Sequence, residues 1–273
     1  MARKRITQLF PFLTGIRVWQ RNLFYRIGMY FDNNTYSNNF GDTLENEVCS
    51  AKTLMINENS GHPLIYQENK VYNLKIASKT MNKIIIKPNE TFSFCYLLHN
   101  SKKYGKFKDG LILIDGKIVA RKGGGLCHLS NLLHYLFLMS PLDVIERHGH
   151  KVKSIPNPDE NSLEGVDATI SSGWLDLRVK NNTDNIYQID ISFDDCYMYG
   201  KILSSEKPNV EYEIINDDFK YIKKNDKIYE SVSVIKLEKD KENGKIVNRK
   251  KLYDEVVEIT YELSEDQLVE EIK

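Results

Sequence analysis

Cys127 stands where a run of three glycines, residues 123–125, gives way to an apolar pattern with helical spacing that ends before Pro141. A cysteine in the first turn of a helix lies at the positive end of the helix dipole, where the thiolate form is favoured. Glycines also let a substrate carbonyl or phosphate approach the backbone closely, because they have no Cβ. The pattern therefore predicts a nucleophilic cysteine at the start of a helix.

A thiolate nucleophile needs a base that can hold its proton and a third group that orients the base. Residues 144–152 read as a strand on which His148 and His150 share one face, and Asp167 lies in a second predicted strand, residues 165–170. Papain-like and transglutaminase-like enzymes use this order of groups, which is an analogy of arrangement and not of descent. These residues are therefore candidates for cysteine-dependent acyl chemistry.

Other interpretations of the same residues stay open. Most single cysteines are small buried hydrophobic residues, and Cys127 can be one of them. The cysteine with both histidines and Asp167 would also make a plausible zinc set, although no local spacing singles out a metal site. The glycines can form a tight turn between a strand and a helix. Because they lack the Gly-Lys-Ser/Thr ending of a phosphate loop, we expect no nucleotide binding.

Three more polar residues lie close to these candidates in the sequence. Arg147 either clamps a substrate carboxylate or pairs with Glu146 or another surface acid, and we favour the ion pair. His128 and His134 lie on the predicted helix after the glycines. We expect these two histidines to be exposed or to cap the helix, and not to bind a metal.

The motifs resemble those of the VanW family. In that family a run of glycines, one variable residue and Cys-Gln-x-Ser are followed by Glu-Arg-x-x-His, by Gly-x-Asp-Ala-Thr-Val and by an aromatic-rich hairpin. The corresponding stretches here are residues 123–130, 146–150, 165–170 and 174–191. With residues 88–94 the resemblance covers residues 65–195. His128 stands where the family usually has glutamine, so an amide role at that place would fall to an imidazole or be lost.

The resemblance favours His150 over His148 as the base, because His150 fills the last position of the second motif. The predicted catalytic set is Cys127 as nucleophile, His150 as base and Asp167 as the orienting group. The predicted substrate-binding residues are Gly123, Gly124, Gly125, His128, Ser130, Arg147 and His148. We predict no metal and no cofactor.

The resemblance implies a role in glycopeptide resistance or cell-wall metabolism. One hypothesis is a cysteine-dependent acyl transferase or amide hydrolase acting on a peptidoglycan-related peptide. The other is a non-catalytic module that binds a cell-wall precursor or a partner protein through the same glycine-rich loop.

Composition restricts the class of protein. The chain has 273 residues, 41 % of them hydrophobic, which is enough for a core without disulfides or metals, and so excludes collagen, wholesale disorder and a disulfide scaffold. Its 38 basic and 38 acidic residues cancel, so we expect no nucleic-acid partner. The four cysteines are widely spaced, which suits reduced thiols. No export signal or membrane span is recognisable, which predicts a cytoplasmic location.

Hydrophobic periodicity predicts an α+β fold: an antiparallel sheet with a central helix that carries the glycine-rich, cysteine-containing N-terminus, plus a C-terminal β appendage. The domain division we predict is a basic amphipathic leader (1–32), an α+β core (33–205) and a β-rich C-terminal region (206–273). Predicted helices are 45–55, 72–81 and the one after the glycines. Predicted strands include 83–86, 91–94, a hairpin of 111–114 with 117–120, an antiparallel pair of 174–179 with 186–193, and 210–215, 220–229, 231–237 and 250–263 with a turn at Asn243-Gly244.

The leader has six basic residues and no acidic residue between Met1 and Phe31. Its apolar residues recur at helical spacing from Leu9 to Ile27, with Arg17 and Arg21 one turn apart on another face. Such a helix either lies on an anionic membrane surface or packs on its own domain. We favour this internal packing, with peripheral membrane contact through residues 1–31 as the alternative.

Overall fold

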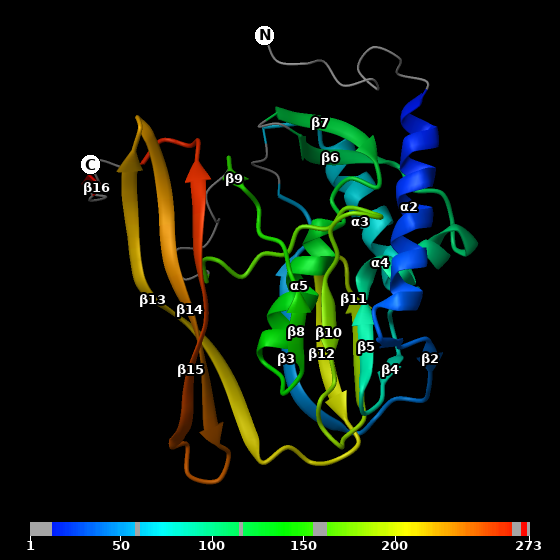
Figure 1. Ribbon diagram of the computed structural model, residues 1–273, viewed down its shortest axis with the longest axis vertical. Helices are drawn as coiled ribbons and strands as arrows, with labels where there is room; N and C mark the ends of the chain where they lie inside the picture. Colours follow the sequence, from blue (N-terminus) through cyan, green and yellow to red (C-terminus); the bar gives the residue numbers. More distant parts are fainter. Residues whose placement is uncertain (1–12, 58–60, 115–116, 155–162, 264–268, 272–273) are drawn as a thin grey trace.

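The computed structural model describes residues 13–57, 61–114, 117–154, 163–263 and 269–271, and it confirms the α+β class (Figure 1). The helices are α2 (Leu13–Phe31), α3 (Ile65–Ser78), α4 (Phe94–Leu98), the 3₁₀ helix η1 (His99–Lys103) and α5 (Cys127–Leu138). The shorter strands are β1 (Thr35–Tyr36), β2 (Asn39–Phe40), β4 (Ile84–Ile86), β5 (Glu90–Ser93), β8 (Asp143–Glu146), β9 (Val152–Lys153), β10 (Arg178–Lys180) and β16 (Val269–Glu271). The longer strands are β3 (Asn46–Leu54), β6 (Asp109–Ile114), β7 (Lys117–Lys122), β11 (Tyr187–Phe193), β12 (Tyr197–Ser204), β13 (Val210–Lys224), β14 (Lys227–Asp240) and β15 (Ile246–Ile259).

Two sheets and the helix after the glycines form the core. One sheet has the order β1-β5-β10-β8 and the other β2-β4-β11-β12-β3. Leu129, Leu133 and Leu136 of α5 are fully buried at helical spacing, so this helix presents one apolar face to the sheets. A Cβ on Gly200 of β12 would come within 2.6 Å of Leu136, so α5 packs closely over this strand.

A third sheet, of order β16-β13-β14-β15-β9, stands beside the core (Figure 1). Its three long strands are antiparallel neighbours, joined by turns that include Asn225-Asp226 and Gly244, all with positive φ. Strand β9 belongs by sequence to the core, yet it pairs in parallel with β15, where Val152 faces Glu258. This pairing fixes the C-terminal sheet against the loop that carries His150.

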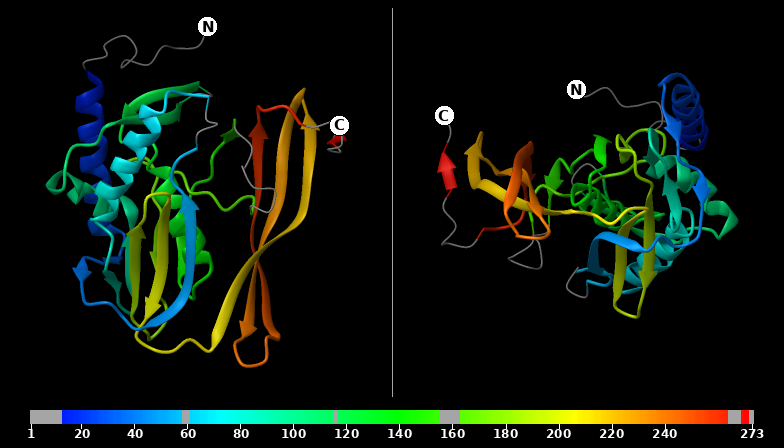
Figure 2. Two further views of the ribbon diagram at one scale, coloured as in Figure 1. Left: turned by 180° about the vertical axis from the view of Figure 1, so that it is seen from behind. Right: turned by 90° about the horizontal axis from the view of Figure 1, so that it is seen from below.

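Helix α2 lies at the opposite end of the molecule from the C-terminal sheet, as two perpendicular views agree (Figure 2). Its contacts with the core run through polar side chains, such as Arg21 to the carbonyl of Ser172 at 2.9 Å. No helix among the described residues is long and apolar enough to cross a membrane.

Several local predictions are confirmed. The helix predicted for 72–81 overlaps the second half of α3, which starts earlier, at Ile65, and ends at Ser78. Strands 111–114 and 117–120 form the β6–β7 hairpin, although its turn, residues 115–116, lies outside the described residues. The turn at Asn243-Gly244 joins β14 to β15, as predicted.

Three predictions fail because the sheets decide the conformation. Residues 45–55, predicted as a helix, form β3, which pairs along nearly its whole length with β12. Residues 174–179 and 186–193 do not pair with each other, since β10 joins β5 and β8 while β11 joins β4 and β12. The Asn181 side chain donates to the carbonyl of Ile86 at 3.1 Å and to that of Asn185 at 2.7 Å, and so holds the crossover between the two sheets. The C-terminal segment 220–229 is interrupted by the turn between β13 and β14.

The two predicted strands around the candidate site are also largely absent. Strand β8 ends at Glu146, and residues 147–151 leave the sheet before β9. Residues 165–170 are irregular from Gly165 onward, which has φ +73. His148 and His150 therefore do not share the face of a strand, because the side chains of this loop are fixed by ion pairs and not by a ladder.

Substitution of Gly124 tests how closely the glycine run packs against strand β6. A Cβ at this position would overlap the carbonyl of Gly110 in β6, so Gly124→Ala forces the β6–β7 hairpin away from the loop. We expect a loss of about 1–3 kcal/mol in the free energy of unfolding, measured by urea denaturation. Gly28→Ala in α2, where a Cβ meets nothing within 4 Å, is the matched control and should be neutral or slightly stabilising. Equal stability of the two variants would contradict this account of the packing.

Candidate functional site

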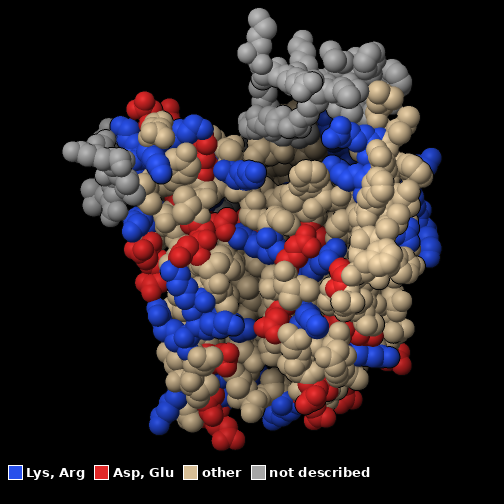
Figure 3. Space-filling model, viewed as in Figure 1, with Lys and Arg blue, Asp and Glu red and all other residues tan. Residues whose placement is uncertain are grey.

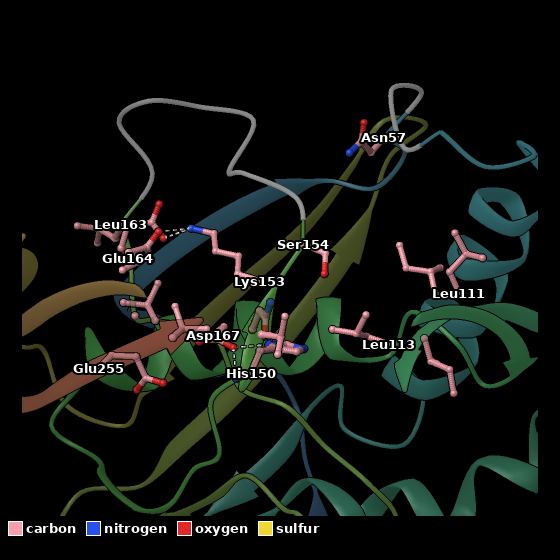
Figure 4. Close-up of a pocket in the computed structure, with 18 of the residues that line it drawn as sticks. Asn57, Leu111, Leu113, His150, Lys153, Ser154, Leu163, Glu164, Asp167 and Glu255 are labelled. Carbon is pink, nitrogen blue, oxygen red and sulfur yellow. Dashed lines mark hydrogen bonds and ion pairs between the residues drawn. The ribbon is translucent and has the colours of Figure 1, made fainter. Parts of the chain in front are cut away.

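A cavity of about 490 Å³ opens between the β6–β7 hairpin and the loops that carry His150 and Asp167 (Figure 4). Leu111 and Leu113 of β6 lie on one side, whereas Lys153, Glu164 and Glu255 lie on the other. The C-terminal sheet also contributes Glu230 and Val257. The cavity therefore lies where the core meets the C-terminal sheet.

His150 and Asp167 line this cavity, and Cys127, at the start of α5, interacts with the His150 side chain. The Nδ1 atom of His150 is in contact with Oδ2 of Asp167, and the backbone N–H of His150 donates to the same oxygen at 2.8 Å. The Cys127 side chain also interacts with His150 and is one of the causes of the raised pKa of His150. Because Asp167 occupies Nδ1, Nε2 is the nitrogen left for the sulfur. Cys127 is partly exposed, at the first residue of α5.

The electrostatics of the pair favour an ionised histidine and carboxylate. Burial lowers the pKa of His150, but the hydrogen bonds to Asp167 and Cys127 outweigh it and raise this pKa to about 10. Burial raises the pKa of Asp167, but the hydrogen bond to His150 and the charge of Arg147 outweigh it and lower this pKa to about 2. At neutral pH the site therefore holds an imidazolium paired with the Asp167 carboxylate.

Arg147 is fixed by the protein itself. Its Nε donates to the backbone carbonyl of Asp167 at 2.6 Å, and its Nη2 donates to Oδ1 of Asp167 at 2.8 Å and to the carbonyl of Gly165 at 3.0 Å. Its Nη1 pairs with Glu255 of β15. The acid we expected as its partner is therefore Asp167 together with Glu255, not Glu146. Arg147 holds the Asp167 carboxylate in place, and its guanidinium is already engaged on three nitrogens.

Side chains of α5 hydrogen-bond to the backbone of the loop that carries Asp167. The Ser130 hydroxyl donates to the carbonyl of Ala168 at 2.5 Å, and the N–H of Ala168 donates to Asn131 at 2.8 Å. His134 Nδ1 lies 2.8 Å from the carbonyl of Val166. Ser130 is fully buried, so it positions the loop and offers no surface to a substrate. His134 is also fully buried, which contradicts our expectation of an exposed or capping residue, and burial lowers its pKa to about 4.

The glycine run serves close packing as well as the turn. Gly123 and Gly125 have φ +80 and +88, a conformation that side chains disfavour, and a Cβ on Gly125 would overlap the aliphatic chain of Lys70. The Gly124 carbonyl accepts a hydrogen bond from Asn73 at 3.0 Å. The interpretation as a tight strand-to-helix turn therefore fits the geometry.

His128 and His148 have partners outside the group formed by Cys127, His150 and Asp167. His128 Nε2 lies 2.8 Å from the Thr53 hydroxyl of β3, and burial with the nearby Lys70 charge lowers the pKa of His128 to about 4. His148 Nε2 lies 3.0 Å from Glu146. Neither side chain belongs to the wall of the cavity. Within the part of the chain that the structure describes, no group of three or more His, Cys, Asp or Glu residues is arranged to hold a metal ion.

Charged residues in the cavity were not identified from the sequence. Burial lowers the pKa of Lys70 to about 8. Lys153 pairs with Glu164 at 2.5 Å and with Glu230 at 3.0 Å. Burial and the charge of Glu164 raise the pKa of Glu230 to about 7. Lys153 follows His150 by three residues, but its partners Glu164 and Glu230 come from other segments of the chain. No local sequence motif therefore predicts this group of charged residues.

The fold and site define an α+β protein with a cysteine at a helix start, supported by a histidine and an aspartate from two following loops. Residues 69–203 match the family described as VanW like protein. The chain is 42 % identical over 272 residues to the vancomycin B-type resistance protein VanW of Enterococcus faecalis, covering 99 % of each chain. The chain belongs to the VanW family.

A second relative is more distant. The uncharacterized protein YoaR of Bacillus subtilis is 29 % identical over 110 residues, which cover 40 % of this chain and 35 % of the relative. No solved structure matches the chain.

The His150–Asp167 pair predicts how stability depends on pH. Because the folded pKa of His150, about 10, lies above its ordinary value of 6.5, the pair contributes fully below pH 6.5 and is lost as pH rises toward 10. Asp167 acts in the opposite sense: its contribution is present above pH 3.8 and is lost as pH falls toward 2. Urea denaturation between pH 6 and pH 10 should therefore show stability falling in the wild type.

In His150→Asn the stability should decrease less between pH 6 and pH 10 than in the wild type. His62→Asn, which alters a histidine that also lines the cavity, is the control and should retain the wild-type slope. An unchanged slope in His150→Asn would show that other groups cause the fall. An NMR titration of the His150 ring in Asp167→Asn should in addition give a pKa below that in the wild type.

Proposed function

We propose that this protein is an accessory factor of vancomycin resistance that acts as a cysteine-dependent acyl transferase or amide hydrolase on a peptidoglycan-related peptide. The resistance role rests on the near full-length similarity to the Enterococcus faecalis protein of that name. The chemistry rests on one observation: His150, which lines the cavity with Asp167, is hydrogen-bonded to Asp167 and also interacts with Cys127.

In the proposed first step the Cys127 thiolate, whose proton His150 holds, attacks a carbonyl carbon of the peptide, and N–H groups at the start of α5 stabilise the oxyanion. The tetrahedral intermediate collapses when the C–N bond breaks. The departing amine takes the proton held by His150, and a thioester on Cys127 remains. Water or an acceptor amine then attacks the thioester, His150 takes the proton of this nucleophile, and the free cysteine is regenerated.

Asp167 and Arg147 act as positioning residues in this scheme. Asp167 holds Nδ1 of His150, which leaves Nε2 for the sulfur, and Arg147 holds Asp167 through two hydrogen bonds. The apolar side chains of β6 and the Lys153–Glu230 pair offer a peptide both apolar and charged contacts. A cavity of this size is suited to a few residues of a peptide.

The reactivity of Cys127 tests the proposal directly. Cys127 should be alkylated by iodoacetamide at pH 6 at least about tenfold faster than the exposed Cys196, because an ordinary thiol is scarcely ionised at that pH. Peptide mapping by mass spectrometry after timed labelling measures both rates in one sample. His150→Gln should remove the difference. Labelling of Cys127 no faster than that of Cys196 would contradict the nucleophile assignment.

Turnover and phenotype distinguish the enzyme from a binding module. Incubation with a peptidoglycan stem peptide should give a covalent acyl adduct on Cys127 and a cleaved or transferred product, detected by intact-mass spectrometry. Cys127→Ser should abolish both, and Asp167→Asn should slow product formation by roughly 10²-fold or more. Cys196→Ser is the matched control and should retain full activity. If folded Cys127→Ser still supports resistance, the non-catalytic binding function is the correct one.

A further inference from the structure

Helix α2 presents its apolar side chains to solvent and its polar side chains to the protein. Along its 19 residues the exposed apolar positions range from Val18, 39 % exposed, to Tyr30, 87 % exposed. We name as the outward face of α2 the residues Ile16, Trp19, Leu23, Phe24, Ile27, Tyr30 and Phe31. At roughly 100° per residue these positions fall within one sector about 140° wide.

The opposite side of α2 is held by hydrogen bonds. Tyr25 donates to Asp176 at 2.6 Å, and Arg178 donates to the Tyr25 hydroxyl at 2.7 Å. Arg21 and Arg26 contact the carbonyl of Ser172 and the ring of His99. Met29 is the one apolar side chain of the helix that is buried among those described. The helix is thus fixed to the core in an orientation that keeps its outward face away from the core.

This arrangement reverses the usual one, in which the apolar face of an amphipathic helix covers the core. A contiguous apolar face of this kind marks a surface that another phase or molecule covers. Its aromatic members, Trp19, Phe24, Tyr30 and Phe31, are of the types that bind at the boundary between lipid headgroups and acyl chains.

Charge indicates which occupant fits. The segment from Met1 to Phe31 has six basic residues and no acidic residue, so it is attracted to an anionic surface. Arg17 and Arg26, both exposed, flank the outward face on its two sides along the helix. In the space-filling view, the side of the molecule on which α2 lies is largely without charge and is bordered by Lys and Arg (Figure 3). We propose that the outward face of α2 binds an anionic phospholipid surface, with the helix axis parallel to the membrane.

Vesicle co-sedimentation of the full chain tests the proposal. The protein should bind vesicles of phosphatidylglycerol and phosphatidylcholine, and binding should weaken at about 1 M salt, where the Debye length falls to about 3 Å. Trp19→Gln combined with Phe24→Gln should lower the partition coefficient at least about tenfold. Phe219→Gln combined with Val247→Gln, which alters exposed apolar side chains of the C-terminal sheet, is the matched control and should bind as the wild type does.

A fluorescence measurement reports the insertion itself. The chain has two tryptophans, so Trp174→Phe leaves Trp19 as the only emitter. Its emission should shift to shorter wavelength when the same vesicles are added. Circular dichroism confirms that each variant is folded. Equal vesicle binding by the wild type and the Trp19/Phe24 variant, or the absence of a shift in Trp174→Phe, would overturn the proposal.

A second copy of the chain is the competing occupant. Sedimentation equilibrium without lipid should give a mass that does not depend on protein concentration. A mass that rises with concentration in the wild type, but not in the Trp19/Phe24 variant, would assign the outward face to self-association and overturn the lipid proposal. Neither result depends on the chemistry of Cys127, so this test is separate from that of the proposed function.

Discussion

The arrangement of the site depends on the guanidinium of Arg147. This group is largely buried, with 10 % of its side chain exposed. It joins the loop that carries Arg147 itself, the loop at residues 165–167 and strand β15. It binds the backbone and carboxylate of Asp167, the carbonyl of Gly165, and Glu255 of β15. A buried guanidinium must be paired on nearly all sides, because an unpaired charge in the interior is costly. The requirement fixes the irregular loop 165–168 and the edge of the C-terminal sheet against each other.

Asp167 is therefore held from two directions. Arg147 fixes it from the side of the C-terminal sheet, whereas Ser130, Asn131 and His134 of α5 fix the backbone around it from below. Because Cys127 begins the same helix, the proposed nucleophile and the loop that carries Asp167 share one rigid support. His150 is then placed between them by two hydrogen bonds to Asp167, one from its ring and one from its backbone. Irregular loops can hold a precise constellation when their backbone groups are bonded to a helix in this way.

Local patterns in the sequence were sufficient for the elements that depend on local physics. The glycine run followed by the apolar repeat located α5 and placed Cys127 at its first turn, since positive φ and helical periodicity are local properties. The Asn243-Gly244 turn was found for the same reason. Residues 45–55 were wrongly predicted as a helix because the strand conformation of β3 is imposed by β12, about 150 residues further along the chain.

The candidate site could be predicted only in part, and for the same physical reason. Cys127, His150 and Asp167 were identified from their types and order, but the loop geometry that joins them comes from ion pairs between distant residues. Glu255 lies 108 residues from Arg147, and Glu230 lies 77 residues from Lys153. In a strand that alternates polar and apolar residues, the local sequence does not distinguish a carboxylate with a distant ion-pair partner from one exposed to solvent. Those contacts appear only once β9 pairs with β15.

One polar cluster places the outward face of α2 and the cavity in a fixed relation. Arg178 bonds Tyr25 of α2 and also pairs with Glu146 at 3.1 Å, and Glu146 directly precedes Arg147 in the chain. Asp176 reinforces this cluster from a fully buried position, where it accepts hydrogen bonds from Tyr25 and Ser93. Such contacts do not by themselves transmit a signal between two sites. They do make the helix a rigid part of the core, so a membrane bound at α2 would fix the direction in which the cavity opens. A substrate carried by that membrane would then meet the cavity in one orientation, which lowers the entropic cost of its capture.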